Sequence, residues 1–214
     1  ASAVGMYYND AALGAKRKKY LTDVVKKMQE KTDAVKNGWT AYRNQFVDNA
    51  GTDANSGFSK MINAYSLYYE RYLRSGKIGL PVGAMTGVSK PGLVESYYSP
   101  VHSKTFALEA LNAVKTCYFG SNTSTNNANS IYTYVRTIGT KDENGKLIAD
   151  LISEKFDIAS SSLNGLGIIK DDVQNNRAKV LETYQKLQEL VPLIKVDMVS
   201  ALGVSITYTD NDGD

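Results

Sequence analysis

Apolar side chains recur every three or four positions along most of this 214-residue chain. Residues 12–49 contain no proline and carry one such stripe, formed by Tyr20, Val24, Met28, Val35, Trp39, Tyr42 and Phe46. This spacing predicts a long α-helix, because residues three, four and seven apart lie on the same face. Gly51 and a polar run then end the pattern. A side-chain oxygen of Asp53, Asn55 or Ser56 is suited to cap the helix that follows.

The second predicted helix covers residues 57–74. Its apolar positions again lie three or four apart, at Phe58, Met61, Ile62, Tyr65, Tyr68, Tyr69, Tyr72 and Leu73. Ser75 and Gly76 are predicted to end it. Residues 77–83, Lys-Ile-Gly-Leu-Pro-Val-Gly, are rich in glycine and proline and predict a short extended crossover.

Helical spacing continues in residues 101–119, 130–138, 146–158 and 171–202. Polar loops at 121–129 and 160–170 separate these segments. The pattern predicts an all-α fold of antiparallel helices that share a core, as one or two bundles. We treat residues 1–214 as one helical region, with a subdivision into two bundle-like parts expected near 121–129.

Composition narrows the classes of function. With 43% apolar and 22% charged residues, the chain is typical of a folded protein, and no run approaches the roughly 18 apolar residues of a transmembrane helix. A single cysteine, Cys117, and a single histidine, His102, exclude a disulfide framework and any multi-cysteine or multi-histidine metal site within the chain. A net charge of +3 argues against a nucleic acid as the main partner.

The densest basic run is Lys-Arg-Lys-Lys at residues 16–19. Successive helical residues point about 100° apart, so these four cannot form one binding row. Asp23 and Glu30 also dilute the charge. We therefore favour a solvated face over a phosphate-binding patch.

Four tyrosines on the second predicted helix allow two interpretations. Tyr65, Tyr68, Tyr69 and Tyr72 could line a ligand groove, since phenol rings are rigid and carry a hydroxyl. At helical spacing, core and rim packing is the more common arrangement, and we favour it.

A polar cluster precedes the third main helix and forms the predicted ligand site: Glu95, Ser96, Ser99, His102 and Ser103. Free backbone N–H groups at a helix start favour anionic ligands. A metal on His102 would need further ligands, and Glu109 lies about 10 Å along the helix, too far to share the ion. A histidine that stabilises the turn is favoured, and we predict no catalytic and no metal-binding residue in this chain.

Three ordered stretches resemble a known family. They are the Lys-Lys-Tyr-Leu opening of the first helix with Trp39 and Tyr42, residues 93–99 (Leu-Val-Glu-Ser-Tyr-Tyr-Ser) leading to 113–120 (Ala-Val-Lys-Thr-Cys-Tyr-Phe-Gly), and residues 195–204 (Lys-Val-Asp-Met-Val-Ser-Ala-Leu-Gly-Val) running to Asp-Gly-Asp at 212–214. In order and spacing they resemble the C-terminal part of imelysin-like proteins, the family of the insulin-cleaving membrane protease.

The resemblance implies a helical fold, export to the bacterial periplasm or cell surface, often as a lipoprotein, and a link to iron uptake. It also implies a nominal classification as a metallopeptidase, whose Gly-x-His-x-x-Glu signature this chain lacks. His102 has Pro100 two residues before it and Thr105 three residues after it, so neither the glycine nor the glutamate is in place. The resemblance places that signature in an upstream part of the protein, which is missing from this chain.

We therefore expect a binding protein of an iron-acquisition system that holds a ligand or a partner protein through the predicted ligand site. One alternative is a metallopeptidase whose iron or zinc is held by residues outside this chain, and the other is a purely structural interaction module. The identity of the cofactor stays open. Besides the unknown ligand, the expected partners are an iron-acquisition protein and the missing N-terminal part of the same protein.

Overall fold

The computed structural model describes residues 3–121 and 129–208. The chain divides into two compact units, Ala1–Ala50 and Gly51–Asp214, which we call unit 1 and unit 2. Residues on both sides of the loop at 121–129 belong to unit 2, and residues 122–128 of that loop lie outside the described ranges.

Unit 1 consists of α1 (Ala3–Tyr8) and α2 (Gly14–Asp48), which confirms the long helix that the apolar stripe predicted. The Arg17 guanidinium donates a hydrogen bond to the Tyr7 carbonyl at 2.7 Å and lies 3.7 Å from the centre of the Tyr7 ring. Gly14 allows the two helices to approach, since a Cβ atom there would lie 2.5 Å from the Tyr8 carbonyl oxygen. It is the one buried residue of α2.

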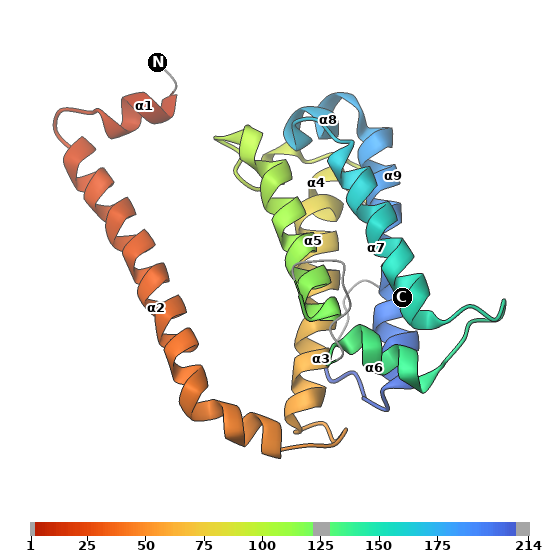
Figure 1. Ribbon diagram of the computed structural model, residues 1–214. Coiled ribbons are helices and arrows are strands. Elements are labelled where there is room, and N and C mark those ends of the chain that lie inside the picture. The colour runs from red at the N-terminus through yellow and green to blue at the C-terminus, as the bar shows by residue number, and fades with distance from the viewer. Residues whose placement is uncertain (1–2, 122–128, 209–214) are drawn as a thin grey trace. The chain divides into compact units, whose positions relative to one another are not determined.

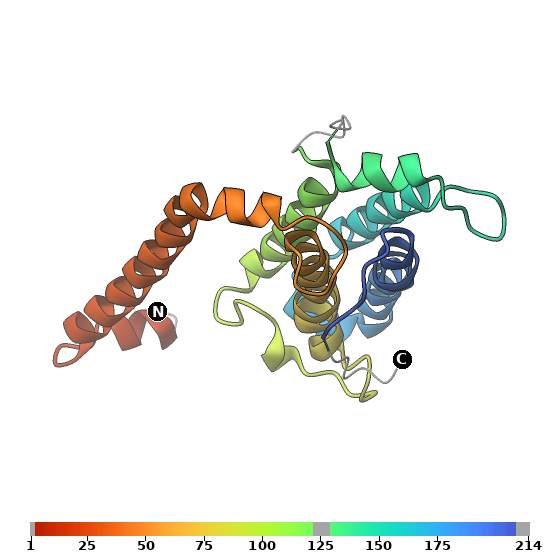
Figure 2. The ribbon, with the colours of Figure 1, turned by 90° about the horizontal axis from the view of Figure 1, so that it is seen from below.

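Unit 2 is a bundle of antiparallel helices, which confirms the predicted all-α fold (Figure 1). Its long elements are α3 (Gly57–Leu67) with η1 (Tyr68–Gly79), α5 (Ser103–Phe119), α7 (Ile148–Asn164) and α9 (Arg177–Gln188). They run alternately up and down, and seen from below they enclose a common core (Figure 2). The shorter elements are α4 (Leu80–Val82), η2 (Pro91–Leu93), η3 (Pro100–His102), α6 (Ile131–Ile138), α8 (Ile169–Asn175), α10 (Leu190–Pro192), η4 (Leu193–Met198) and α11 (Val199–Ala201).

Side chains from every long helix of unit 2 meet in this core. Leu73 of η1, Leu111 of α5, Phe156 of α7 and Leu187 of α9 are almost completely buried. The Phe156 ring packs against the Tyr69 and Tyr118 rings, with centroids 6.3 and 5.7 Å apart. The apolar stripes that predicted the helices of unit 2 therefore also identify the faces that pack together.

Two helices, α3 and α6, start at a serine cap. Ser56 is the N-cap of α3, and its hydroxyl accepts a hydrogen bond from the Ser59 N–H at 3.0 Å. Ser130 caps α6 in the same way through the Thr133 N–H at 3.1 Å. Each contact satisfies a backbone donor that the helix itself cannot pair.

The extended crossover predicted for residues 77–83 is wrong. The helix does not end at Ser75 and Gly76 but continues as the π-helix η1 to Gly79 and then as α4. The wider π-helical turn bonds each N–H five residues back, as the Leu80 N–H does to the Ser75 carbonyl, and it leads directly into α4. Pro81 stands in the first turn of α4, where a missing N–H costs little. The chain turns only at Gly83, whose φ of 66° suits glycine.

The predicted polar loop at 160–170 is shorter than expected, since α7 continues to Asn164 and α8 begins at Ile169. The apolar stripe of α7 explains the difference, because Ala159 and Leu163 continue the completely buried face that includes Phe156. Within the described ranges, the only β-type pairing is an isolated antiparallel bridge between Lys141 and Leu147.

Candidate functional site

The structure places the five residues of the predicted ligand site around η3 and the start of α5. Three serines use their polar groups locally. Ser96 Oγ donates to the Ser99 carbonyl at 3.0 Å, and the buried Ser103 donates to the Pro100 carbonyl at 2.6 Å. His102 is exposed and stacks on Phe106, with ring centroids 6.1 Å apart. These contacts shape a turn, whereas Glu95 lines a hollow of the surface.

That hollow has a volume of about 470 Å³ and is lined by Tyr68, Tyr72, Gly76, Lys77 and Glu95. We call it the tyrosine hollow. Four of its residues come from η1, and Glu95 comes from the segment after η2. Lys77 donates to Glu95 Oε2 at 2.5 Å and so ties this segment to η1. The hollow therefore combines two phenol rings with one positive and one negative charge.

The two rings of the hollow form a single aromatic surface. Tyr68 and Tyr72 lie four residues apart on η1, and their ring centroids are 6.1 Å apart at an interplanar angle of 37°. Tyr68 is 40% exposed and Tyr72 is 56% exposed. Gly76 lies about one helical turn after Tyr72, and it has no side chain that would fill the tyrosine hollow. A ligand with a flat apolar face can stack on this surface.

The four-tyrosine cluster thus divides into two pairs with different roles. Tyr65 and Tyr69 are buried, as the packing interpretation predicted, whereas Tyr68 and Tyr72 line the hollow, as the groove interpretation predicted. Burial raises the pKa of both Tyr65 and Tyr69 well above the ordinary value. The Tyr69 hydroxyl donates to the Leu187 carbonyl at 2.6 Å, which joins η1 to α9.

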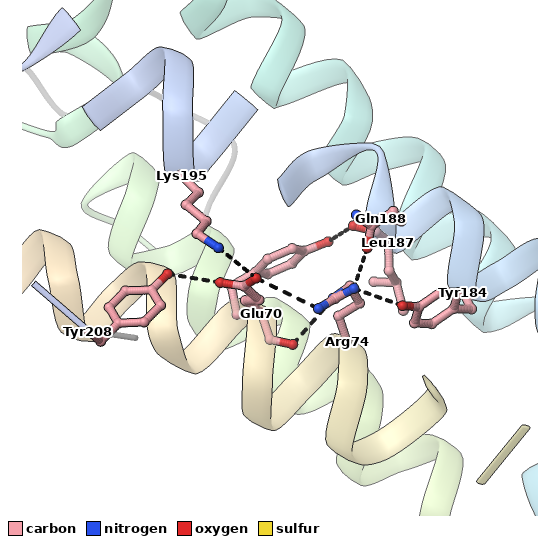
Figure 3. A network of polar contacts seen from close by, with 8 residues as sticks. Glu70, Arg74, Tyr184, Leu187, Gln188, Lys195 and Tyr208 are labelled. Atoms are coloured by element: carbon pink, nitrogen blue, oxygen red, sulfur yellow. Dashed lines mark hydrogen bonds and ion pairs between the residues drawn. The ribbon is translucent and has the colours of Figure 1, made fainter. Parts of the chain in front are cut away.

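A buried charged cluster, which the sequence patterns above did not predict, surrounds Glu70 and Arg74 of η1 (Figure 3). Glu70 and Arg74 are both nearly inaccessible to solvent, and Glu70 Oε1 lies 3.8 Å from the Arg74 guanidinium. Lys195 of η4 donates to Glu70 Oε1 at 3.0 Å, and the Tyr208 hydroxyl donates to Glu70 Oε2 at 2.9 Å. Arg74 also donates to the Tyr184 hydroxyl at 2.7 Å and to Gln188. We call these six side chains the buried charge cluster.

The buried charge cluster connects η1, α9, η4 and the chain after α11. Its acid and bases pair with one another, so none is left to act on a ligand, and we assign it a structural role. A signal for it exists in the sequence. Polar residues recur three or four apart on the α3–η1 helix and are all buried: Ser59, Asn63, Ser66, Glu70 and Arg74.

A second, larger hollow of about 610 Å³ follows α7. Its carboxylates are paired with bases: Asp150 with Arg136 at 3.2 Å, Asp157 with Lys115 at 2.8 Å and Glu154 with Lys146. Among the residues that the structure describes, no three His, Cys, Asp or Glu side chains are grouped as metal ligands would be. Among the helices of the described part of the chain, none is long and apolar enough to span a membrane.

Comparison with known proteins identifies a family. No curated protein and no solved structure matches the chain significantly. The model of the Imelysin family matches residues 5–194, which includes α2 and most of unit 2. This match confirms the resemblance to the imelysin family, and it includes the first two of the three ordered stretches, while residues 195–204 and 212–214 lie beyond it. The chain belongs to the imelysin family.

Proposed function

We propose that this imelysin family protein is a binding component of an iron-uptake system, exported to the periplasm or cell surface. Its ligand binds in the tyrosine hollow. Family membership supports export and the link to iron uptake. The observation that carries the binding role is the exposed pair of phenol rings beside a charged pair, Lys77 and Glu95.

The residues of the hollow define the chemistry of the ligand. Tyr68 and Tyr72 provide a flat amphipathic surface, which suits a planar ligand. The Lys77 side chain is only 16% exposed and holds its charge at the edge of that surface, where an anionic group can exchange for Glu95. A planar, anionic, iron-carrying compound fits both features, and haem with its two carboxylates is a suitable probe.

Titration of the full chain with haem, followed by the visible absorption spectrum, tests this proposal. The double variant Tyr68→Ala/Tyr72→Ala should weaken haem binding at least tenfold, since it removes the stacking surface. Tyr98→Ala is the matched control, because it deletes an 82% exposed tyrosine outside the hollow. Ferric citrate, which has no flat apolar face, should bind much more weakly than haem.

Two further variants separate the hollow from the turn beside it. Lys77→Gln should weaken haem binding, whereas Ser99→Ala should leave it unchanged if the hollow is the site. Weakening by Ser99→Ala and not by Lys77→Gln would transfer the site to the turn around η3. Equal binding by the double variant and the control would refute the tyrosine hollow. Zinc-dependent, chelator-sensitive cleavage of an unfolded protein would favour a peptidase instead.

A further inference from the structure

The apolar stripe of α2 has a period of seven residues. Two lines run along the helix, each with a residue at every seventh position: Leu21, Met28, Val35 and Tyr42 in one, and Val25, Thr32, Trp39 and Phe46 in the other. The lines are four residues apart, which is the spacing of the two apolar positions in a coiled-coil heptad. We call these eight positions the α2 seam. It extends over 26 residues, about 38 Å at 1.5 Å per residue.

Side chains of the seam lie on the surface of unit 1. Val35 is 77% exposed and Met28 is 66% exposed. The two lines join near the end of α2, because Tyr42 of one line contacts Trp39 and Phe46 of the other, with ring centroids 6.0 and 6.2 Å away. An exposed strip of this length, with an indole ring and two phenyl-type rings, is unfavourable in water and calls for a partner.

Charges beside the seam indicate which partner fits. The positions that flank a heptad seam carry Lys31, Lys36 and Arg43 between residues 21 and 46, and no carboxylate. Asp23, Glu30 and Asp33 fall on the remaining face of the helix. In coiled coils the flanking positions select partners by charge, so acidic flanks on the partner are complementary here.

We propose that the α2 seam binds an amphipathic helix whose apolar seam is flanked by acidic residues. A second copy of α2 fits poorly, because a parallel pair would place Lys31 opposite Lys36, and an antiparallel pair would also bring basic flanks together. A membrane surface fits less well than a helix. The apolar strip is narrow, since polar side chains border it except at Val24 and Gly38, whereas interfacial helices present a broad apolar face.

Trp39 makes the test direct, since it is the only tryptophan of the chain and lies within the seam. The probes are two 28-residue peptides without tryptophan, both with leucine at the seam positions, one with glutamate and the other with lysine at the flanks. The glutamate-flanked peptide should shift Trp39 emission to shorter wavelength and bind the full chain at least tenfold more tightly than the lysine-flanked peptide.

Two matched pairs of variants locate the binding site. Val35→Glu should weaken binding of the glutamate-flanked peptide at least tenfold, whereas Asn37→Glu adds the same charge on the opposite face and should not. Lys36→Glu/Arg43→Glu should reverse the preference toward the lysine-flanked peptide, while Lys26→Glu, away from the seam, should not. Circular dichroism shows whether each variant keeps its helix content.

Several outcomes would overturn the proposal. If the chain binds both peptides equally, or binds neither of them, the basic flanks do not select an acidic partner helix. A larger shift of Trp39 emission with phosphatidylglycerol vesicles than with the peptide assigns the seam to a membrane surface. Self-association of the chain that Val35→Glu abolishes assigns it to a second copy. Emission from a buried indole in the chain alone shows that the seam is already covered.

Discussion

Helix α2 and the α3–η1 helix carry the same kind of apolar stripe, but their stripes have different surroundings. Ile62 and Leu73 of α3–η1 are completely buried, whereas Val35 of α2 lies mostly in solvent on unit 1. Helical periodicity reports that one face of a helix needs a partner, and it contains no information on which partner covers that face. The same sequence signal therefore marks a core in unit 2 and a docking surface in unit 1.

Charged residues show the same contrast. Lys19 and Asp23 on α2, and Glu70 and Arg74 on η1, are both acid–base pairs four residues apart. The first pair is exposed and the second is buried among neighbours from three other segments. Spacing alone gives both pairs the same interpretation, although burial gives them very different energetic weight.

The largest expected difference comes from deleting an aromatic ring in each region. Phe156→Ala should lower the free energy of unfolding of unit 2 by about 3–5 kcal/mol, because it leaves a cavity beside Tyr69 and Tyr118. Trp39→Ala should cost less than about 1 kcal/mol, since the Trp39 ring is almost half exposed. Guanidinium unfolding followed by circular dichroism measures both, and similar losses would remove the contrast between the two helices.

Removing one carboxylate from each charged pair should give a smaller difference. Glu70→Ala leaves Arg74 and Lys195 buried without their acid and should cost about 3 kcal/mol. Asp23→Ala breaks an exposed pair on α2 and should cost less than about 1 kcal/mol. A double-mutant cycle between Glu70 and Lys195 measures their coupling. A coupling no larger than that between Lys19 and Asp23 would contradict the role assigned to the buried charge cluster.

Local patterns were sufficient to predict most of the helices and the family, and they narrowed the cap of α3 to Asp53, Asn55 or Ser56. They failed at residues 77–83, where glycine and proline indicated an extended segment. Both residues lie in a helix here, because the backbone dihedrals at Gly79 stay helical at the end of η1 and Pro81 falls in the first turn of α4. Residue preferences describe the common α-helical geometry, so a change of helical pitch is hard to read from them.

For the candidate site, the sequence located Glu95 and the tyrosines but not their combination. Which tyrosines face solvent depends on how η1 lies against α5 and α9, and these contacts are made by residues far apart in the chain. The buried charge cluster is a stronger example. Glu70 pairs with Lys195 and Tyr208, 125 and 138 residues further along, and no local pattern specifies such a pairing.

Two glycines extend the comparison to the backbone, with effects of opposite sign. At Gly79 a Cβ atom would lie 2.8 Å from a ring carbon of Tyr184, whose hydroxyl is held by Arg74. Gly79→Ala should therefore destabilise unit 2 by about 1–2 kcal/mol. Gly38 of α2 has no neighbour within 4 Å, and Gly38→Ala should stabilise its helix by about 0.5–1 kcal/mol. Thermal unfolding of both variants checks the signs, and stabilisation by Gly79→Ala would show that the Tyr184 ring yields freely.

The smallest expected effect is on the pH dependence of the stability of unit 2. It comes from two carboxylates whose pKa values are shifted in opposite directions. Hydrogen bonds from Lys155 of α7 and from Lys186 hold the pKa of Glu189 below its ordinary value. A carboxyl whose pKa is lower in the folded state stabilises the fold above its unfolded pKa of about 4.3, and this stabilisation is lost as pH falls through the folded pKa. Glu189→Gln should therefore lower the melting temperature at pH 7, and the difference from the unmodified chain should shrink below about pH 4.

Asp197 of η4 supplies the control with the reverse sign. Burial raises the pKa of Asp197, so its charged form is disfavoured in the folded state and opposes folding as pH rises above the ordinary aspartate value of about 3.9. Asp197→Asn should raise the melting temperature slightly at pH 7 and have little effect near pH 3. Melting curves of both variants between pH 3 and 8 should thus diverge toward neutral pH. If the melting temperatures of both variants run parallel to those of the unmodified chain, neither carboxyl is linked to folding. The charges of Glu189 and Asp197 would then affect the stability of unit 2 as little as the exposed Lys19–Asp23 pair affects that of α2.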